Sequence, residues 1–272
     1  TGLSVGGIVV TPFIKWILDT QGIRNGSPWL ALIWFCGTVP VTLLLLRAFP
    51  QPYGWLPDGA RAAPGEIANI SGTPLAEAVR SRFYKAVTFG YIFALGAQVG
   101  GALQLVKLVE ERTDRSTATL ATIVLSTMSI LSRFAAGQII PKINMTRFTV
   151  GLAGLQGISL ASLGLINNRI GLLIAIGLFG VTIGNMVMMQ SLLLAERFGV
   201  RDYPKIAARS GLISFSGTAL GPLLLGWLYD VAGGYRSSYL AAGACSIIGA
   251  ILFSFAGSAS VASTEVAPAQ SQ

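Results

Sequence analysis

Long apolar runs alternate with short polar breaks along the 272-residue chain. A helix needs about 20 consecutive apolar residues to cross roughly 30 Å of hydrocarbon. Runs of this length predict eight spans, at residues 2–18, 28–46, 83–108, 117–140, 148–167, 170–195, 210–229 and 237–257. The strands of a membrane barrel would alternate apolar and polar residues, and these runs do not. We therefore expect an all-α polytopic membrane protein.

Composition agrees with this prediction. Hydrophobic residues make up 53% of the chain and charged residues 11%, whereas a soluble domain carries about 25% charged residues. The mean hydropathy is +0.67. The net charge is +8, but the basic residues lie between apolar runs and form no patch with interleaved aromatics, which argues against a nucleic-acid partner.

Histidine is absent, and the two cysteines, Cys36 and Cys245, lie in separate apolar runs. We therefore expect two buried free thiols, no disulfide and no metal site. Catalytic sets that need histidine are excluded as well, so we predict a protein that is not an enzyme and has no cofactor.

The longest polar break covers residues 47–82 and is rich in proline, glycine and charge. It predicts a linker between two helical bundles, with two helices in residues 1–46 and six in residues 83–257; residues 258–272 predict a disordered tail. Most Lys and Arg residues flank the spans on the side of the linker, so we expect the linker and tail to be cytoplasmic and the membrane to be a bacterial inner membrane. The chain opens with threonine inside an apolar run, and we expect further helices upstream.

Polar residues in the run 117–140 recur every three or four positions, a spacing that keeps one helix face. They are Thr119, Thr122, Ser126, Ser129 and Arg133. Arg133 lies about 24 Å along the helix axis from Thr117, near the linker side. Two interpretations remain open. The arginine is either a topological anchor that reaches the headgroups, or it binds a carboxylate through two parallel hydrogen bonds, with Ser129 and Ser126 as neighbours.

Four other polar residues lie inside spans: Gln98, Gln104, Asn185 and Gln190. Each either lines a pore or bridges helices. Small residues at helical spacing predict close helix contacts. They are Gly96 and Gly100, Gly180 and Gly184, Gly217 and Gly221, and the series Gly151, Gly154 and Gly157.

Three stretches resemble the major facilitator superfamily, especially its monocarboxylate-transporter-like and oxalate/formate-antiporter-like groups. They are "LQLVKLVEERTDRSTATLATIVLSTMSILSRFAAGQIIPKI" (103–143), "GNMVMMQSLLLAERFG" (184–199) and "GTALGPLLLGWLYDVAGGYRSSY" (217–239). The resemblance implies that the eight spans are family helices five to twelve, that helices one to four are missing from this sequence, and that residues 47–82 are the central loop.

The resemblance also implies a role for Arg133, which matches an arginine implicated in binding the substrate carboxylate. Some family members carry an aspartate four residues before this arginine, where this chain has Ser129. The loop motif G-x-x-x-D-R is replaced by "GQIIPKI", with Pro141 and Lys142 in place of the acid and the base. The resemblance therefore does not extend to a proton-coupling acid or to a gating ion pair at these positions.

The functional prediction is a secondary transporter that carries a small organic anion, such as a monocarboxylate, across the lipid bilayer by alternating access. Arg133, Ser129 and Ser126 are the predicted substrate-binding residues. Thr122, Gln98, Gln104, Asn185 and Gln190 are candidates for lining the passage. Two alternatives remain: an efflux transporter for apolar or cationic compounds, or a membrane scaffold or sensor in which the polar stripe only joins helices.

Overall fold

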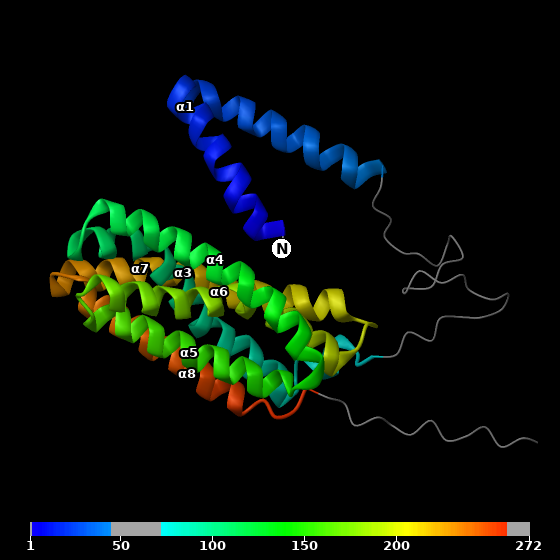
Figure 1. The fold of residues 1–272 in the computed structure, drawn as a ribbon. Coiled ribbons are helices and arrows are strands. Elements are labelled where there is room, and N and C mark those ends of the chain that lie inside the picture. The colour runs from blue at the N-terminus through cyan, green and yellow to red at the C-terminus, as the bar shows by residue number, and fades with distance from the viewer. Residues whose placement is uncertain (1, 45–71, 260–272) are drawn as a thin grey trace, which may run out of the picture. The chain divides into compact units, whose positions relative to one another are not determined.

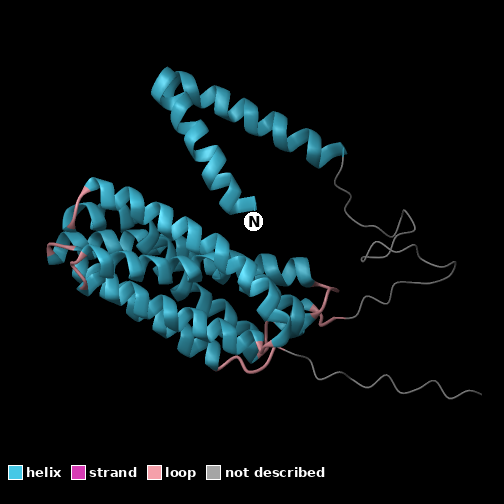
Figure 2. Cartoon of the chain, in the orientation of Figure 1, coloured by secondary structure: helices cyan, strands magenta, loops and turns pink. Residues whose placement is uncertain are grey.

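The computed structural model describes residues 2–44 and 72–259, and the regular elements in these ranges are helices (Figure 2). Seven helical segments of the described part are long and apolar enough to cross a membrane, from Trp16–Leu44 to Tyr235–Ser254. The predicted all-α membrane architecture is therefore confirmed. The chain divides into two compact units, Thr1–Ile70 and Ser71–Gln272, which are described separately below.

The first unit contains α1 (Gly2–Leu44), whose backbone is interrupted at Gly22. The dihedral angles there, φ 71° and ψ 167°, are open to glycine and costly for residues with a side chain. Two helical arms meet at this point (Figure 1). They contain the predicted spans 2–18 and 28–46, the second as far as residue 44. Cys36 is exposed within the described residues, so its predicted burial is wrong.

The second unit is a bundle of long helices that run lengthwise beside one another (Figure 1). Its helices are α3 (Arg82–Arg112), α4 (Arg115–Ile139), α5 (Met145–Leu165), α6 (Arg169–Phe198), α7 (Tyr203–Ala232) and α8 (Tyr235–Ser254). Short turns connect them, so consecutive helices run in opposite directions. The end of the bundle at which α3 begins and α4 stops is called the linker end, and the other is called the far end.

Polar caps extend these helices beyond the apolar runs that predicted them. The side chains of Ser81, Asp114, Asn144 and Asn168 each accept a backbone N–H from the residue three positions later. The hydrogen bond from the Thr117 backbone lowers the pKa of Asp114. Hydropathy detects only the part of a helix that lies in hydrocarbon, whereas caps determine where the helix begins. α7 also begins well before the predicted residue 210, at Tyr203, but it has no side-chain cap and carries Pro204 in its first turn.

Glycines bring α3 and α7 close together. A Cβ atom at Gly96 would lie 3.0 Å from the carbonyl oxygen of Gly217, and one at Gly100 would lie 3.0 Å from that of Gly221. These predicted contacts are confirmed. The prediction is wrong for Gly151 and Gly154, because a Cβ there would meet no described atom within 4 Å. Of that series only Gly157 packs closely, against Gly243 of α8.

The last part of the predicted linker is attached to the turn between α6 and α7. The backbone N–H of Thr73 donates to the Phe198 carbonyl at 2.8 Å, and that of Leu75, at the start of α2 (Leu75–Ala78), donates to the Asp202 carboxylate at 3.0 Å. The Leu75 bond is the main cause of the lowered pKa of Asp202. The rest of the predicted linker, and the predicted tail from residue 260 on, lie outside the described residues.

Candidate functional site

The predicted polar stripe lies on α4, which packs along α6 at two glycines. A Cβ atom at Gly180 would lie 2.6 Å from the carbonyl oxygen of Leu125, and one at Gly184 would collide with the carbonyl oxygen of Ser129. Small residues of this kind allow two backbones to approach closely. The side chains of α4 that flank the two glycines therefore lie directly against α6.

Arg133 lies in this contact and is half-buried. Its Nε atom donates a hydrogen bond of 2.6 Å to the carbonyl oxygen of Gly184. At 1.5 Å per residue, Arg133 is about 9 Å from the end of α4 at Ile139, and it lies within the apolar span Arg115–Lys142. The structure thus places the arginine against a neighbouring helix, with its Nε atom held by the backbone of that helix.

The two predicted serine partners take different places along α4. Ser129 is 6% exposed, and its backbone carbonyl lies at the same Gly184 contact as Arg133. Ser126 is half-buried and lies about 10 Å along the axis from Arg133. The structure therefore brings Arg133 and Ser129 together at α6, with Ser126 about two turns toward the far end.

A second pair of side chains joins α4 to α6 one position away from the arginine. The Asn185 Nδ2 atom donates to the Ser132 hydroxyl at 3.1 Å and to the Val181 carbonyl at 3.0 Å. The Asn185 Oδ1 atom is buried without a hydrogen-bond partner among the described residues. Both side chains line a cavity of about 640 Å³ between α4, α5 and α6. The stripe's spacing missed Ser132 because it lies beside the stripe and not on it.

The stripe reaches the bundle surface toward the far end. Thr122 is exposed, and its hydroxyl donates to the Ala118 carbonyl at 3.2 Å. Together with Thr119, it lines a cavity of about 400 Å³ between α3 and α4, at which Glu110 and Arg115 also lie. The polar face of α4 therefore runs from an exposed cavity toward the buried contact with α6.

Gln190 lies in a separate hydrogen-bond network that joins α3, α6 and α7. Its Nε2 atom donates to Ser214 at 2.9 Å and to Ser210 at 3.2 Å. The Ser210 hydroxyl lies 2.8 Å from the Thr88 hydroxyl. The backbone carbonyl of Thr88 accepts a hydrogen bond from the Ser214 hydroxyl. In this structure Gln190 therefore bridges helices.

Gln98 and Gln104 lie on α3. Gln98 is 5% exposed and Gln104 is half-buried. The Oε1 atom of each is buried without a hydrogen-bond partner among the described residues. An unpaired buried amide oxygen is costly and marks a position where a ligand or water can bind.

The sequence analysis missed a buried glutamine that joins several helices. Gln156 of α5 is fully buried, and its Nε2 atom donates to the Ala94 carbonyl at 2.8 Å and to the Ser246 hydroxyl at 3.0 Å. Its Oε1 atom accepts from Thr182 at 3.4 Å. The residue joins four helices. Its place inside a span was visible in the sequence, but its partners are 26 to 90 positions away.

Residues that could bind a metal do not gather in the described part of the chain, where no group of three or more Cys, Asp or Glu side chains meets. Its one ion pair joins Lys205 and Asp202 at the surface of the linker end, at 3.3 Å. The predicted site therefore depends on one cation, its hydroxyl neighbours and the backbone of α6.

No protein-family model matches the chain, whereas comparisons with individual proteins find similar ones. The chain is 24% identical over 270 residues to monocarboxylate transporter 11 of Mus musculus, an alignment that covers 93% of this chain and 57% of the mouse protein. It thus spans little more than half the length of that relative.

Among solved structures, the fold is similar to that of a variant of the fucose:proton symporter of E. coli. The TM-score is 0.66 at 15% identity, and the match covers 93% of this chain and 66% of the symporter chain. At this level of identity the likeness shows the fold alone.

Proposed function

The chain has the fold of the major facilitator superfamily, as its sequence resemblance implied, and on this premise we propose that the protein is a secondary active transporter that works by alternating access. Its solute is a small organic anion such as a monocarboxylate. The substrate class is supported by Arg133 and by the similarity to the mouse monocarboxylate transporter. The location we propose is a bacterial inner membrane, with the linker end in the cytoplasm because most Lys and Arg residues flank that side.

The observation that carries the proposal is the position of Arg133. A charged side chain within a span is costly, and such residues generally face the interior of a bundle or a water-filled cavity. Arg133 is held against α6 by its bond to Gly184, beside the buried Ser129. A guanidinium has five donors in a rigid fork, so it can bond the protein and still bind a carboxylate through two parallel hydrogen bonds.

Transporters of this kind work by rocking one helical bundle against another. We assign α1 to the N-terminal bundle and α3–α8 to the C-terminal bundle. The stripe on α4 is proposed to contact the solute. Gln98, Gln104 and Asn185 are proposed to contact water or solute through their unpaired amide oxygens.

The test is uptake of labelled lactate into vesicles containing the protein expressed from its complete gene. Replacing Arg133 with Gln removes the charge and should raise the half-saturating lactate concentration by about thirtyfold or more, the effect of breaking a partly buried charge pair. Arg133→Lys keeps the charge but loses the fork, so an intermediate effect is expected. Arg169→Gln, at the exposed start of α6, is the matched control and should transport normally.

The same variants separate the alternatives. If Arg133 is only an anchor in an efflux transporter, Arg133→Gln lowers the amount of inserted protein, and lactate uptake per molecule stays unchanged. Uptake of lactamide, which lacks the carboxylate, serves as a second reference because it should not depend on Arg133. Unchanged lactate kinetics in well-inserted Arg133→Gln protein would overturn the proposed site.

A further inference from the structure

Three basic side chains surround a pocket of about 570 Å³ at the linker end of the bundle. Arg80, Arg82 and Lys85 line it together with Phe89 and Phe93 of α3 and Leu252 of α8. All three cations are exposed, and none lies within 4.0 Å of a carboxylate in the described part of the chain. Glu77, only three positions before Arg80, makes no such pair either. The pocket therefore carries a strong positive charge.

The membrane geometry of this pocket favours an anion at headgroup depth. Arg82 is the first residue of the apolar span Arg82–Arg112 and lies 5.8 Å from the ring centroid of Phe255, just past the end of α8. The positive end of the α3 helix dipole is at the same place. Cations at the end of a span lie near lipid phosphates, and basic pockets between membrane helices bind anionic headgroups.

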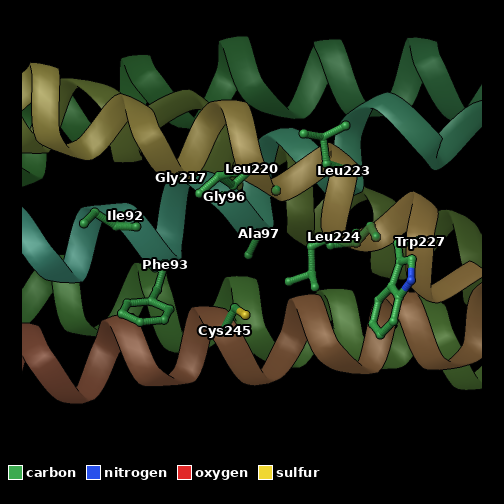
Figure 3. Close-up of a pocket in the computed structure, with 12 residues that line it drawn as sticks. Ile92, Phe93, Gly96, Ala97, Gly217, Leu220, Leu223, Leu224, Trp227 and Cys245 are labelled. Atoms are coloured by element: carbon green, nitrogen blue, oxygen red, sulfur yellow. The ribbon is translucent and has the colours of Figure 1, made fainter.

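An apolar groove lies further along α3 (Figure 3). Phe93 lines both cavities. The groove holds about 530 Å³, and Phe93 and Ala97 of α3 point into it, as do Leu224 and Trp227 of α7, with Cys245 of α8 on the other side. The groove is open because α3 and α7 meet through glycines, which leave no side chains to fill the crossing.

The two cavities together match the length of one lipid. Phe93 is about 16 Å along α3 from Arg82, close to half of the roughly 30 Å hydrocarbon thickness. An acyl chain that starts at the basic pocket therefore passes Phe89 and Phe93 and reaches the groove near the middle of the bilayer. A soluble anion would use the cations but not the groove, and an apolar solute would use the groove but not the cations.

We propose that this continuous surface is a binding site for an anionic phospholipid of the leaflet at the linker end. Arg80, Arg82 and Lys85 bind the headgroup phosphate, and one acyl chain lies over Phe93 in the groove between α7 and α8. The lipid would cover a surface that α3, α7 and α8 form together. Because α7 packs on α3 and α8, the lipid would contact the helices that position α7. This inference does not depend on which solute the protein carries.

The test measures lipids that stay bound to the purified protein by native mass spectrometry, with phosphatidylglycerol and phosphatidylcholine of identical chains added in turn. The wild type should retain phosphatidylglycerol about tenfold or more over phosphatidylcholine. The triple variant Arg80→Gln, Arg82→Gln, Lys85→Gln should retain the two equally, since each cation near an anionic surface contributes a several-fold preference. Excess inorganic phosphate should not displace the lipid.

A matched triple variant removes the same charge from the same end but outside the pocket: Lys142→Gln, Arg201→Gln, Arg209→Gln. It should keep the wild-type preference. The groove is tested with Cys245→Phe, which fills it and should abolish the preference for long-chain over short-chain phosphatidylglycerol. If the first triple variant is not monodisperse, Lys85→Gln alone should lower the preference about threefold.

Three results would overturn the proposal. A preference unchanged in the pocket variants shows that the cations do not bind the headgroup. An equal loss in the control triple variant shows only a general attraction between basic surface and anionic lipid. Equal binding of long and short chains to the wild type, or displacement by phosphate, shows that a soluble anion or another copy of the chain is the better occupant.

Discussion

Gly184 offers a direct test of the contact that positions Arg133. In Gly184→Ala the added Cβ atom would overlap the carbonyl oxygen of Ser129 and lie 2.7 Å from the Ser132 hydroxyl and 3.2 Å from the Arg133 Cγ atom. Ordinary contacts between carbon atoms are about 3.5–4.0 Å, so the helices must separate by roughly 1 Å. Overpacking of this kind costs about 1–3 kcal/mol.

Gly177→Ala is the matched control. Gly177 lies seven positions earlier on the same face of α6, and a Cβ atom there would lie 3.7 Å from the side chains of Met128 and Val124, an ordinary contact. Both variants gain the same helix propensity from replacing glycine with alanine, up to about 1 kcal/mol. The difference between them therefore isolates the clash, and for a unit of this size 1–3 kcal/mol corresponds to roughly 2–12 °C in Tm.

The assays are thermal unfolding in detergent and lactate uptake in vesicles. Gly184→Ala should unfold at the lower temperature of the two variants. It should also raise the half-saturating lactate concentration about tenfold or more, because a shift of about 1 Å at a positioned group has effects of this size. Equal unfolding temperatures together with equal uptake would refute the packing of α4 on α6 described here.

Two further predictions concern other contacts of the second unit. The pKa of Asp202 is lowered mainly by the Leu75 backbone hydrogen bond, so the stability that this bond contributes is present above the unfolded pKa of 3.8 and is lost as pH falls through the lower folded value. Protection of the Leu75 amide against hydrogen exchange should therefore fall below about pH 4 in the wild type, and it should be low at every pH in Asp202→Ala, which has no acceptor there. Gln156→Leu removes hydrogen bonds from α5 to α3, α6 and α8 and should destabilise the protein by about 1–2 kcal/mol in reversible unfolding, while Gln156→Glu, which places a carboxylate among the same partners, should cost more. A Gln156→Leu variant as stable as the wild type would show that the hydrogen bonds of Gln156 add nothing to the free energy of unfolding.

The helices were predictable because the bilayer restricts what a chain can do. Every backbone polar group in hydrocarbon must be paired within the chain, so a run such as 170–195 has to be helical, and α6 spans Arg169–Phe198. Helix ends were less predictable, since a cap such as Asn168 or a proline such as Pro204 acts outside the apolar run. The sequence predicted two separate spans on either side of Gly22, but it did not predict a bend at that residue.

The candidate site was predictable on one helix and not across helices. The spacing of three and four positions identifies the face of α4 that carries Ser129 and Arg133, because helix geometry is local. The bond from Arg133 to Gly184 depends on how α4 and α6 pack, and the two residues are 51 positions apart. Likewise, glycine spacing alone did not distinguish Gly157, which packs against α8, from Gly151 and Gly154, where an added Cβ would meet no described atom within 4 Å.

The central claim is that the stripe of α4 borders a water-filled passage through the membrane. Single cysteines at Ser126 and at Ile158 test it directly, in a background where Cys36 and Cys245 are replaced by Ala. Ile158 is exposed on α5 and lines none of the cavities described above, so its side chain should face lipid. A charged thiol reagent that cannot enter the bilayer should label the cysteine at 126, and lactate should slow that labelling, while the cysteine at 158 stays unreactive. Equal reactivity at both positions, or an unreactive cysteine at 126 in folded protein, would contradict the claim.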